Sequence, residues 1–213
     1  WIFGMGKFDS LTHSMTTIAT GGFSNYNQSI GYFNSVYIEI SSMVFIILGS
    51  VPFIAYIKFL NGNKKIFSND AQIKSFLKII ILSILILCFY LFFTSNENFS
   101  LRSIFFNTIS ILTGTGYVNA EFDSWGSFPI TIFLALMFIG GCAGSTTGGL
   151  KIFRFQILFK YINLHLKKML KPHSIIASRF NGRKINETTY ESVMSFFFLY
   201  ILTFFTSALL LSF

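Results

Sequence analysis

The chain has 213 residues, of which 53% are hydrophobic and only 11% are charged, whereas a soluble domain carries about 25% charged residues. A core of this size has no room for so much apolar surface, which excludes an ordinary soluble protein and predicts an all-α integral membrane protein. The net charge of +8 does not indicate nucleic-acid binding, because fourteen of the sixteen Lys and Arg residues lie in two stretches, 58–78 and 151–184, which the positive-inside rule marks as cytoplasmic.

The first part of the chain combines a short apolar stretch with a longer one. Residues 11–19 are apolar but too short to cross a bilayer, and a Gly-rich loop follows them. The next apolar run, residues 40–57, is about 18 residues long and spans a bilayer with little tilt. We expect this run to descend to a cytoplasmic loop at residues 61–77.

The middle of the chain has the same form. Residues 78–93 are the most continuous apolar run and are expected to return outward. Residues 101–112 are again apolar, too short to cross, and followed by glycines. The run at 128–139 is short, and a Gly-rich segment separates it from the basic residues beyond.

The two short apolar stretches superpose with a shift of 94 residues. Under this shift Gly22 falls on Gly116, Phe23 on Tyr117 and Thr16 on Ser110, and an aromatic-rich helix start follows each loop. Such an internal repeat indicates a unit of spanning helix, short re-entrant helix, glycine loop and spanning helix. Irregular backbone at membrane depth is allowed where protein shields it or where it lines a wet cavity.

The repeated loops have the composition of a cation filter. A dehydrated potassium ion needs oxygen ligands in place of water, and backbone carbonyls supply them where small residues let the chain turn. A helix C-terminus that points at the site adds partial negative charge. Two exposed glycine turns are the simpler interpretation, although the shared shift favours a pore. The candidate ion-binding residues are Thr20, Gly21, Gly22, Phe23, Gly114, Thr115, Gly116 and Tyr117.

Residues 140–149 interrupt a helix that otherwise runs from 128 to 161. Five of these ten residues are glycines, each costing about 1 kcal/mol in a helix. A phosphate loop is excluded because Leu150 stands where that motif needs Lys; close helix packing through small residues stays an alternative. We interpret the segment as a flexible plug, with gate residues Gly140, Gly141, Gly144, Ser145, Thr146, Thr147, Gly148 and Gly149.

Other polar residues carry weaker signals. Cys88 and Cys142 have no CxxC or metal spacing, and the three His residues have no partners at ligand spacing. The acids Glu39, Glu121 and Asp123 either concentrate cations at the outer mouth or are solvated surface charges. We expect no cofactor and no enzymatic activity.

Three segments give the chain a specific resemblance. MTTIATGGFSNYNQSIGYFNS, ISILTGTGYVNAEFDSW and above all FIGGCAGSTTGGLKIFR resemble the Trk/Ktr/HKT superfamily of potassium transporters, and its Trk-type (TrkH-like) pore-forming subunits most closely, over essentially the whole chain. The resemblance implies four potassium-channel-like helix–pore-loop–helix repeats around one pore, an arrangement that is incomplete in this chain. It makes Gly22 and Gly116 filter glycines and residues 140–149 the gate. Gly114 stands where Thr is commoner, which implies weaker coordination by that loop.

The resemblance also divides the chain. Residues 1–60 would be the second-repeat pore loop and inner helix, 61–77 a cytoplasmic loop, 78–162 the third repeat, 163–191 a cytoplasmic basic segment, and 192–213 the truncated first helix of the fourth repeat. It implies potassium uptake by a multi-pass protein of the bacterial cytoplasmic (inner) membrane that forms a homodimer and binds a cytosolic nucleotide-binding regulatory subunit. The basic residues of 160–184 suit docking of that subunit or contact with anionic lipid.

One other function stays open. A secondary transporter of another cation or small solute also uses Gly-broken helices, but it predicts inverted repeats, whereas these repeats share one orientation. The choice between potassium and sodium, and between channel-like and ion-coupled transport, stays open as well.

Overall fold

The computed structural model describes residues 1–94, 100–171, 179–181 and 183–212, and it is helical except for one short hairpin. It consists of two compact units, Trp1–Lys151 and Ile152–Phe213. Residues 172–178 and 182 of the predicted basic segment lie outside the described residues.

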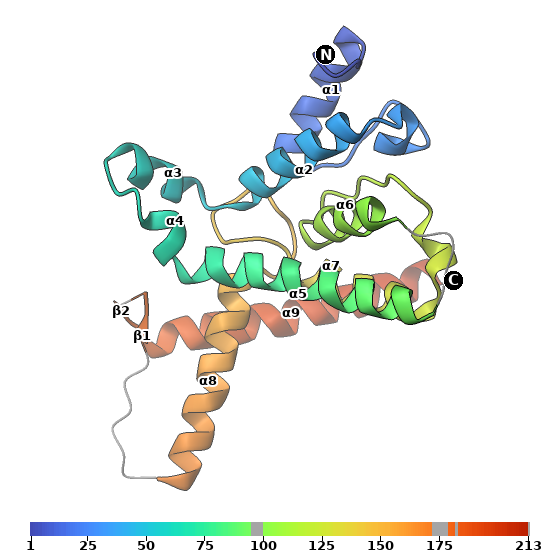
Figure 1. Cartoon of the computed structure of the whole chain (residues 1–213). Helices are drawn as coiled ribbons and strands as arrows, with labels where there is room; N and C mark the ends of the chain where they lie inside the picture. The colour runs from blue at the N-terminus through green and yellow to red at the C-terminus, as the bar shows by residue number, and fades with distance from the viewer. Residues whose placement is uncertain (95–99, 172–178, 182, 213) are drawn as a thin grey trace. The chain divides into compact units, whose positions relative to one another are not determined.

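The first unit contains the two short helices that the repeat predicts (Figure 1). Helices α1 and α6 have twelve residues each. They start at residues 7 and 101 and end at residues 18 and 112, so the starts and the ends are each 94 positions apart. The other elements of the unit are η1 (Ser29–Phe33), α2 (Val36–Ser50), α3 (Phe53–Leu60), α4 (Ile66–Asn69), α5 (Ala71–Phe93), η2 (Phe122–Trp125) and α7 (Ser127–Ile139), with α1 at Lys7–Ile18 and α6 at Leu101–Leu112.

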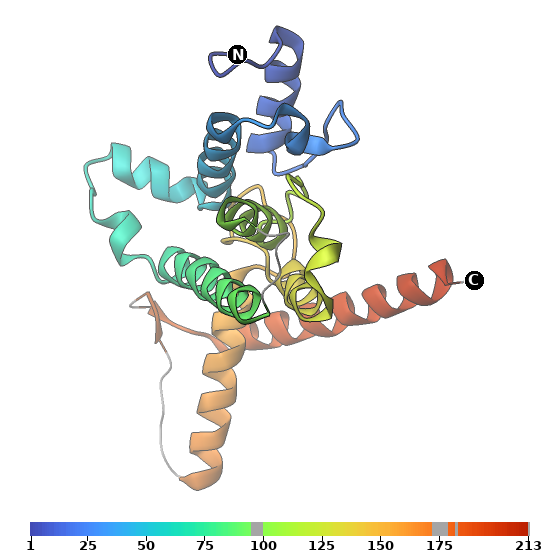
Figure 2. The same ribbon diagram turned by 45° about the vertical axis from the view of Figure 1, so that its right-hand side comes forward.

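Helix α6 lies at the centre of this unit. It packs against α5, α7 and α2, and Figure 2 shows it nearly end-on among them. Its last six residues are all buried. Serine and asparagine side chains are buried with them at Ser110 and Asn107, which indicates that α6 supports a polar site and does more than fill an apolar core.

The predicted span at residues 40–57 is wrong as a single helix. The structure has α2 and α3, bent by 88° at a break of two residues. Pro52 has no N–H to continue the helix, and Val51 before it is extended, as a residue preceding proline prefers. Uniform apolarity hid this break from the hydropathy pattern.

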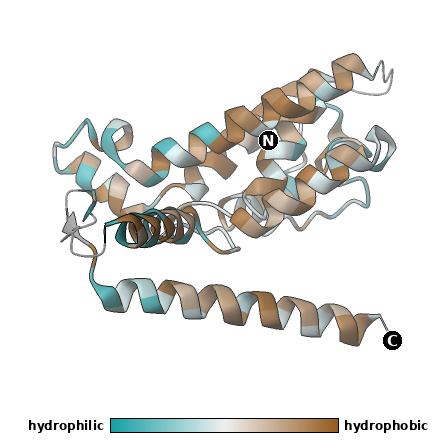
Figure 3. Cartoon of the chain, turned by 90° about the horizontal axis from the view of Figure 1, so that it is seen from below, coloured by the Kyte–Doolittle hydropathy of each residue, from teal (hydrophilic) through white to brown (hydrophobic). Residues whose placement is uncertain are grey.

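Among the described helices, α5 and α9 are long and apolar enough to cross a membrane by length and composition, and α6 and α7 are shorter apolar helices. Helix α5 begins at Ala71, with the Asp70 carboxylate accepting from the backbone N–H groups of Gln72 and Ile73. Figure 3 shows its apolar character beyond the first turns.

The second unit is a helix pair with a hairpin. It contains α8 (Ile152–Leu170), β1 (Arg179–Phe180), β2 (Arg183–Lys184) and α9 (Glu187–Leu211), the strands antiparallel with Arg179 opposite Lys184. Its core joins Ile157 of α8 to Tyr190 and Val193 of α9. The hairpin was not predicted, because two-residue strands leave no periodic signal.

Candidate ion path and loop joint

Each short helix ends in the same hydrogen-bonded turn. Gly21 N–H donates to Thr16 O at 2.8 Å, and 94 positions later Thr115 N–H donates to Ser110 O at 2.9 Å. The backbone is left-handed at Thr20 (φ +50°) and Gly22 (φ +67°), and likewise at Gly114 (φ +72°) and Gly116 (φ +83°). The repeat therefore extends from sequence to backbone conformation. Gly114 stands where Thr is commoner in the family that the chain resembles, and glycine adopts this left-handed conformation without strain.

Hydroxyl groups on both helices hold the loops in the same way. Thr16 Oγ donates to Phe23 O at 3.1 Å, and Ser110 Oγ donates to Tyr117 O at 2.7 Å. Each loop is thus tied across its base to its own helix. These two hydroxyls were not among the predicted site residues, although the 94-residue shift aligns them.

The loop after α1 (residues 20–23, the α1 loop) meets the loop after α6 (residues 114–117, the α6 loop). A methyl group placed on Gly22 would lie 1.7 Å from the Thr115 carbonyl oxygen and 3.2 Å from the Gly116 carbonyl carbon. The structure therefore brings the two predicted filter glycines together, with the Thr115 carbonyl against Gly22. The C-terminal ends of α1 and α6 lead into this meeting point and carry partial negative charge.

The aromatic residues of the two loops differ. Tyr117 is fully buried and its hydroxyl lies 3.2 Å from His13 O and 2.5 Å from Thr16 Oγ on α1, whereas the Phe23 side chain is 77% exposed. Of these two aromatic residues, Tyr117 therefore holds its loop against α1, and Phe23 does not.

Residues 140–149 form a compact loop (the α7 loop) that leaves α7 and returns beside it. Leu150 N–H bonds to Phe138 O at 3.1 Å, closing the base of the loop. Gly140 permits this closure, since its φ is +73° and a methyl group there would lie 2.2 Å from Gly148 O. Within the loop, Gly141 N–H donates to Thr147 Oγ at 3.1 Å.

The α7 loop fills the break between α2 and α3 (Figure 1). The N–H groups of Thr146 and Cys142 donate to the Gly49 and Ser50 carbonyls of α2 at 3.2 and 3.1 Å. In return, Gly144 O accepts from Phe53 N–H, at the start of α3, at 2.9 Å. The loop therefore satisfies backbone groups that the interrupted helix leaves without partners.

The same loop contacts the ends of both short loops. Thr20 Oγ donates to Thr146 Oγ at 3.3 Å, and a methyl group on Gly114 would lie 3.9 Å from Gly148 N. Lys151, which follows the α7 loop, donates from its ammonium group to the Thr147 carbonyl. All predicted filter and gate residues thus belong to one contiguous region of the first unit.

Carboxylates hold the segments that follow each loop. The Asn25 side chain donates to Asp9 at 3.0 Å, and this hydrogen bond holds the pKa of Asp9 below its usual value. At the corresponding position Asn119 donates to Glu39 at 2.8 Å, and Arg102 pairs with the same carboxylate oxygen at 3.1 Å. Glu39 is 1% exposed, so the predicted alternative of a solvated surface charge is wrong for this residue.

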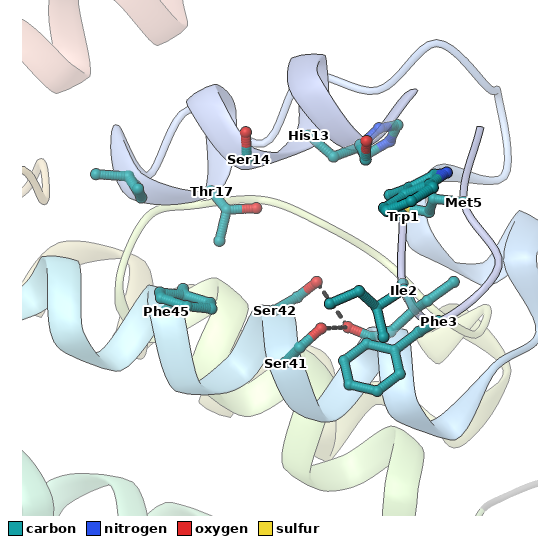
Figure 4. A pocket seen from close by; sticks show the side chains of 13 residues that line it. Trp1, Ile2, Phe3, Met5, His13, Ser14, Thr17, Ser41, Ser42 and Phe45 are labelled. Carbon is teal, nitrogen blue, oxygen red and sulfur yellow. Dashed lines mark hydrogen bonds between the residues drawn. The ribbon is translucent and has the colours of Figure 1, made fainter. Parts of the chain in front are cut away.

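The described polar residues outside this region form no metal-binding cluster. No group of three His, Cys, Asp or Glu side chains within the described ranges has metal-ligand geometry. A separate groove of about 380 Å³ lies between α1 and α2 on the side of the N-terminal residues (Figure 4). Its lining is mainly apolar and includes Trp1, Phe3 and Phe45.

Comparison with known proteins gives one consistent family. A family model described as TrkH, cation transport protein, matches residues 4–212. The Trk system potassium uptake protein TrkI of Halomonas elongata is 34% identical over 205 residues, covering 95% of this chain and 42% of the relative. TrkH of Salmonella typhimurium is 34% identical over 214 residues, covering 98% of this chain and 44% of the relative.

A solved structure agrees with these relatives. The crystal structure of the potassium transporter TrkH from Vibrio parahaemolyticus superposes with a TM-score of 0.88 at 31% identity, over 97% of this chain and 45% of that chain. The chain therefore spans less than half the length of the relatives that it matches.

Proposed function

The chain belongs to the TrkH family of cation transport proteins, and from this premise we propose that it forms part of the ion path of a potassium-uptake protein of the bacterial cytoplasmic membrane. The observation that carries the proposal is the meeting of two matched glycine loops, with Gly22 against the Thr115 carbonyl. The names of the relatives as potassium uptake proteins support potassium as the transported ion.

In this proposal, backbone carbonyls of residues 20–23 and 114–117 replace part of the hydration shell of the ion. The Phe23 and Tyr117 carbonyls already accept hydroxyl hydrogen bonds. The carbonyls of the three preceding residues in each loop are therefore the stronger candidates for ligands. Two further repeats of the complete protein would close the ring.

The α7 loop is proposed as the gate. Its contacts with Thr20 and with the end of α2 support a closed state in which the loop obstructs the path below the filter. Opening would then break the hydrogen bonds to Gly49, Ser50 and Phe53, each of which has a net value of about 1 kcal/mol. Deleting two residues from 140–149 is expected to raise flux; lower or unaltered flux would contradict the gate.

The proposed partners and subdivision follow the family resemblance. We propose a homodimer, a cytosolic nucleotide-binding regulatory subunit and contact with lipid. The basic residues of 160–184 would contact the regulatory subunit or the lipid. The repeat boundaries at 1–60, 78–162 and 192–213 are part of the same proposal.

A growth and uptake experiment tests the function. The complete protein, expressed in a host that lacks potassium uptake, should restore growth at low external potassium and accumulate potassium. The Gly22→Ala variant should express in the membrane yet fail in both measurements. If this variant restores growth as well as the unmodified protein does, the α1 loop is not part of the ion path.

A further inference from the structure

The Tyr117 side chain crosses from the α6 loop to the neighbouring helix α1. Its ring is stacked on His13 with centroids 6.0 Å apart. Its hydroxyl lies within hydrogen-bonding distance of Thr17 Oγ (3.3 Å), Thr16 Oγ (2.5 Å) and His13 O (3.2 Å). A fully buried hydroxyl with three partners on one helix fixes the position of the loop relative to that helix.

The three hydroxyls can form one consistent chain of hydrogen bonds. Thr17 donates to Tyr117, Tyr117 donates to Thr16, and Thr16 donates to the Phe23 carbonyl at 3.1 Å. Each hydroxyl uses its single proton once, and His13 O is the other acceptor within reach of the tyrosine. Hydrogen bonds in such a buried chain polarise and strengthen one another.

The end of this chain is a carbonyl of the other loop. Phe23 O belongs to the α1 loop, so a side chain of the α6 loop orients a backbone group 94 positions earlier in the sequence. The link is not reciprocal within the described residues, because Phe23 has no hydroxyl and its side chain is 77% exposed.

We propose that Tyr117 is a specificity-determining positioning residue. It sets the separation of the two loops and, through Thr16 and the Phe23 carbonyl, fixes the base of the α1 loop, whose three preceding carbonyls are the candidate ligands. This inference rests on the proposed ion path. A change of a few tenths of an ångström in the separation alters how well the carbonyls replace the hydration shell of one cation relative to that of a smaller one.

The test is Tyr117→Phe in the complete protein, which removes one oxygen atom and leaves the stacked ring. We expect the potassium-to-sodium permeability ratio to fall about fivefold, the factor that corresponds to one net hydrogen bond, with potassium flux retained. The matched control is Tyr37→Phe, because Tyr37 is 68% exposed and stacks on Phe3; its ratio should equal that of the unmodified protein.

Variants of Thr16 show whether the hydroxyl chain positions the loops or only stabilises the protein. Thr16→Val removes the hydroxyl and should lower the ratio, whereas Thr16→Ser keeps it and should preserve the ratio. The double variant with Tyr117→Phe should change the ratio no more than one single variant does, because both break the same chain. A lowered melting temperature with unchanged ratios, or strictly additive changes, would overturn the proposal.

The outcome also distinguishes this inference from the function on which it rests. If Gly22→Ala abolishes uptake while Tyr117→Phe leaves selectivity unaltered, the ion path stands and the positioning role fails. If neither variant affects transport, the ion path itself fails.

Discussion

Gly22 and Gly116 occupy equivalent backbone positions but different surroundings. Both have positive φ, yet a methyl group on Gly22 would overlap the Thr115 carbonyl, while one on Gly116 would meet no atom within 4 Å. Substitution at Gly22 is therefore a steric problem between two loops. Substitution at Gly116 chiefly forces a non-glycine residue into the left-handed conformation, which costs about 1–2 kcal/mol.

This difference gives a prediction for Gly116→Ser in the complete protein. The added side chain strains the α6 loop without a direct clash, so transport should persist while potassium selectivity over sodium weakens, by up to about tenfold. Relative permeabilities measured by ion substitution check this result. Unchanged relative permeability would count against assigning residues 114–117 to the filter.

The glycines of the site were predictable from sequence, but their supporting residues were not. The spacing of 94 aligned Gly22 with Gly116 because both positions need left-handed backbone. Thr16 and Ser110 aligned as well, yet a hydroxyl residue in a helix commonly bonds to a carbonyl of the preceding turn, and the sequence gives no sign of a more distant acceptor. Burial of Glu39 was also hidden, because its partner Arg102 is distant in sequence.

Glu39 links elements that belong to different repeats of the chain. It lies in the first turn of α2, whereas its partners Arg102 and Asn119 lie at the start of α6 and beyond the α6 loop. The Gly31 N–H also donates to Val118 O at 3.1 Å. The segment that follows the α6 loop is thus held by residues that follow the α1 loop.

Removing this carboxylate should destabilise the protein. Glu39→Ala leaves the Asn119 amide and the partly exposed Arg102 without their acceptor, and we expect a loss of about 1–3 kcal/mol. A thermal melt of the purified complete protein in detergent measures the change. The exposed Glu121→Ala is the control and should lie within about 0.5 kcal/mol of the unmodified protein; equal effects of the two variants would show that the ion pair contributes nothing.

The break between α2 and α3 and the α7 loop form one joint, as their shared hydrogen bonds show. Sequence analysis located the loop from its glycine density but placed an unbroken helix beside it. Hydropathy averages over residues 40–57 and does not register one proline, and only the contacts of Gly49 and Ser50 reveal why the chain turns there.

A single side chain tests whether this joint restrains opening. Thr146→Val keeps the shape of the residue but removes hydrogen bonds to Gly49 O at 3.0 Å and to Thr20 Oγ at 3.3 Å. Loss of about 1 kcal/mol from the closed state should raise potassium flux about fivefold. Thr146→Ser, which retains the hydroxyl, should leave flux unchanged. If the Val variant has normal flux, these hydrogen bonds do not restrain opening of the gate.

At the scale of the molecule, the two repeats differ in what covers their short helices. In α6, Ile109 is 5% exposed and Leu112 is fully buried, whereas the matching residues of α1, Met15 and Ile18, are 65% and 53% exposed. Helices α5 and α7 pack on α6 in addition to α2. The relatives are more than twice as long as this chain, so a complete protein of that length would have further sequence to cover α1.

We therefore predict that a helix of the complete protein packs on α1 as α5 packs on α6. Ile18 is the informative position, because it lines the apolar groove between α1 and α2 and its counterpart Leu112 has no exposed surface. A photo-crosslinking residue at position 18 should form an intramolecular adduct with a peptide outside 1–213, identified by mass spectrometry. The same residue at Leu60, which is 82% exposed at the end of α3, should not. Adducts to lipid alone at position 18 would mean that the exposed face of α1 borders the bilayer. In that case the two short helices have different surroundings in the complete protein, although their loops match.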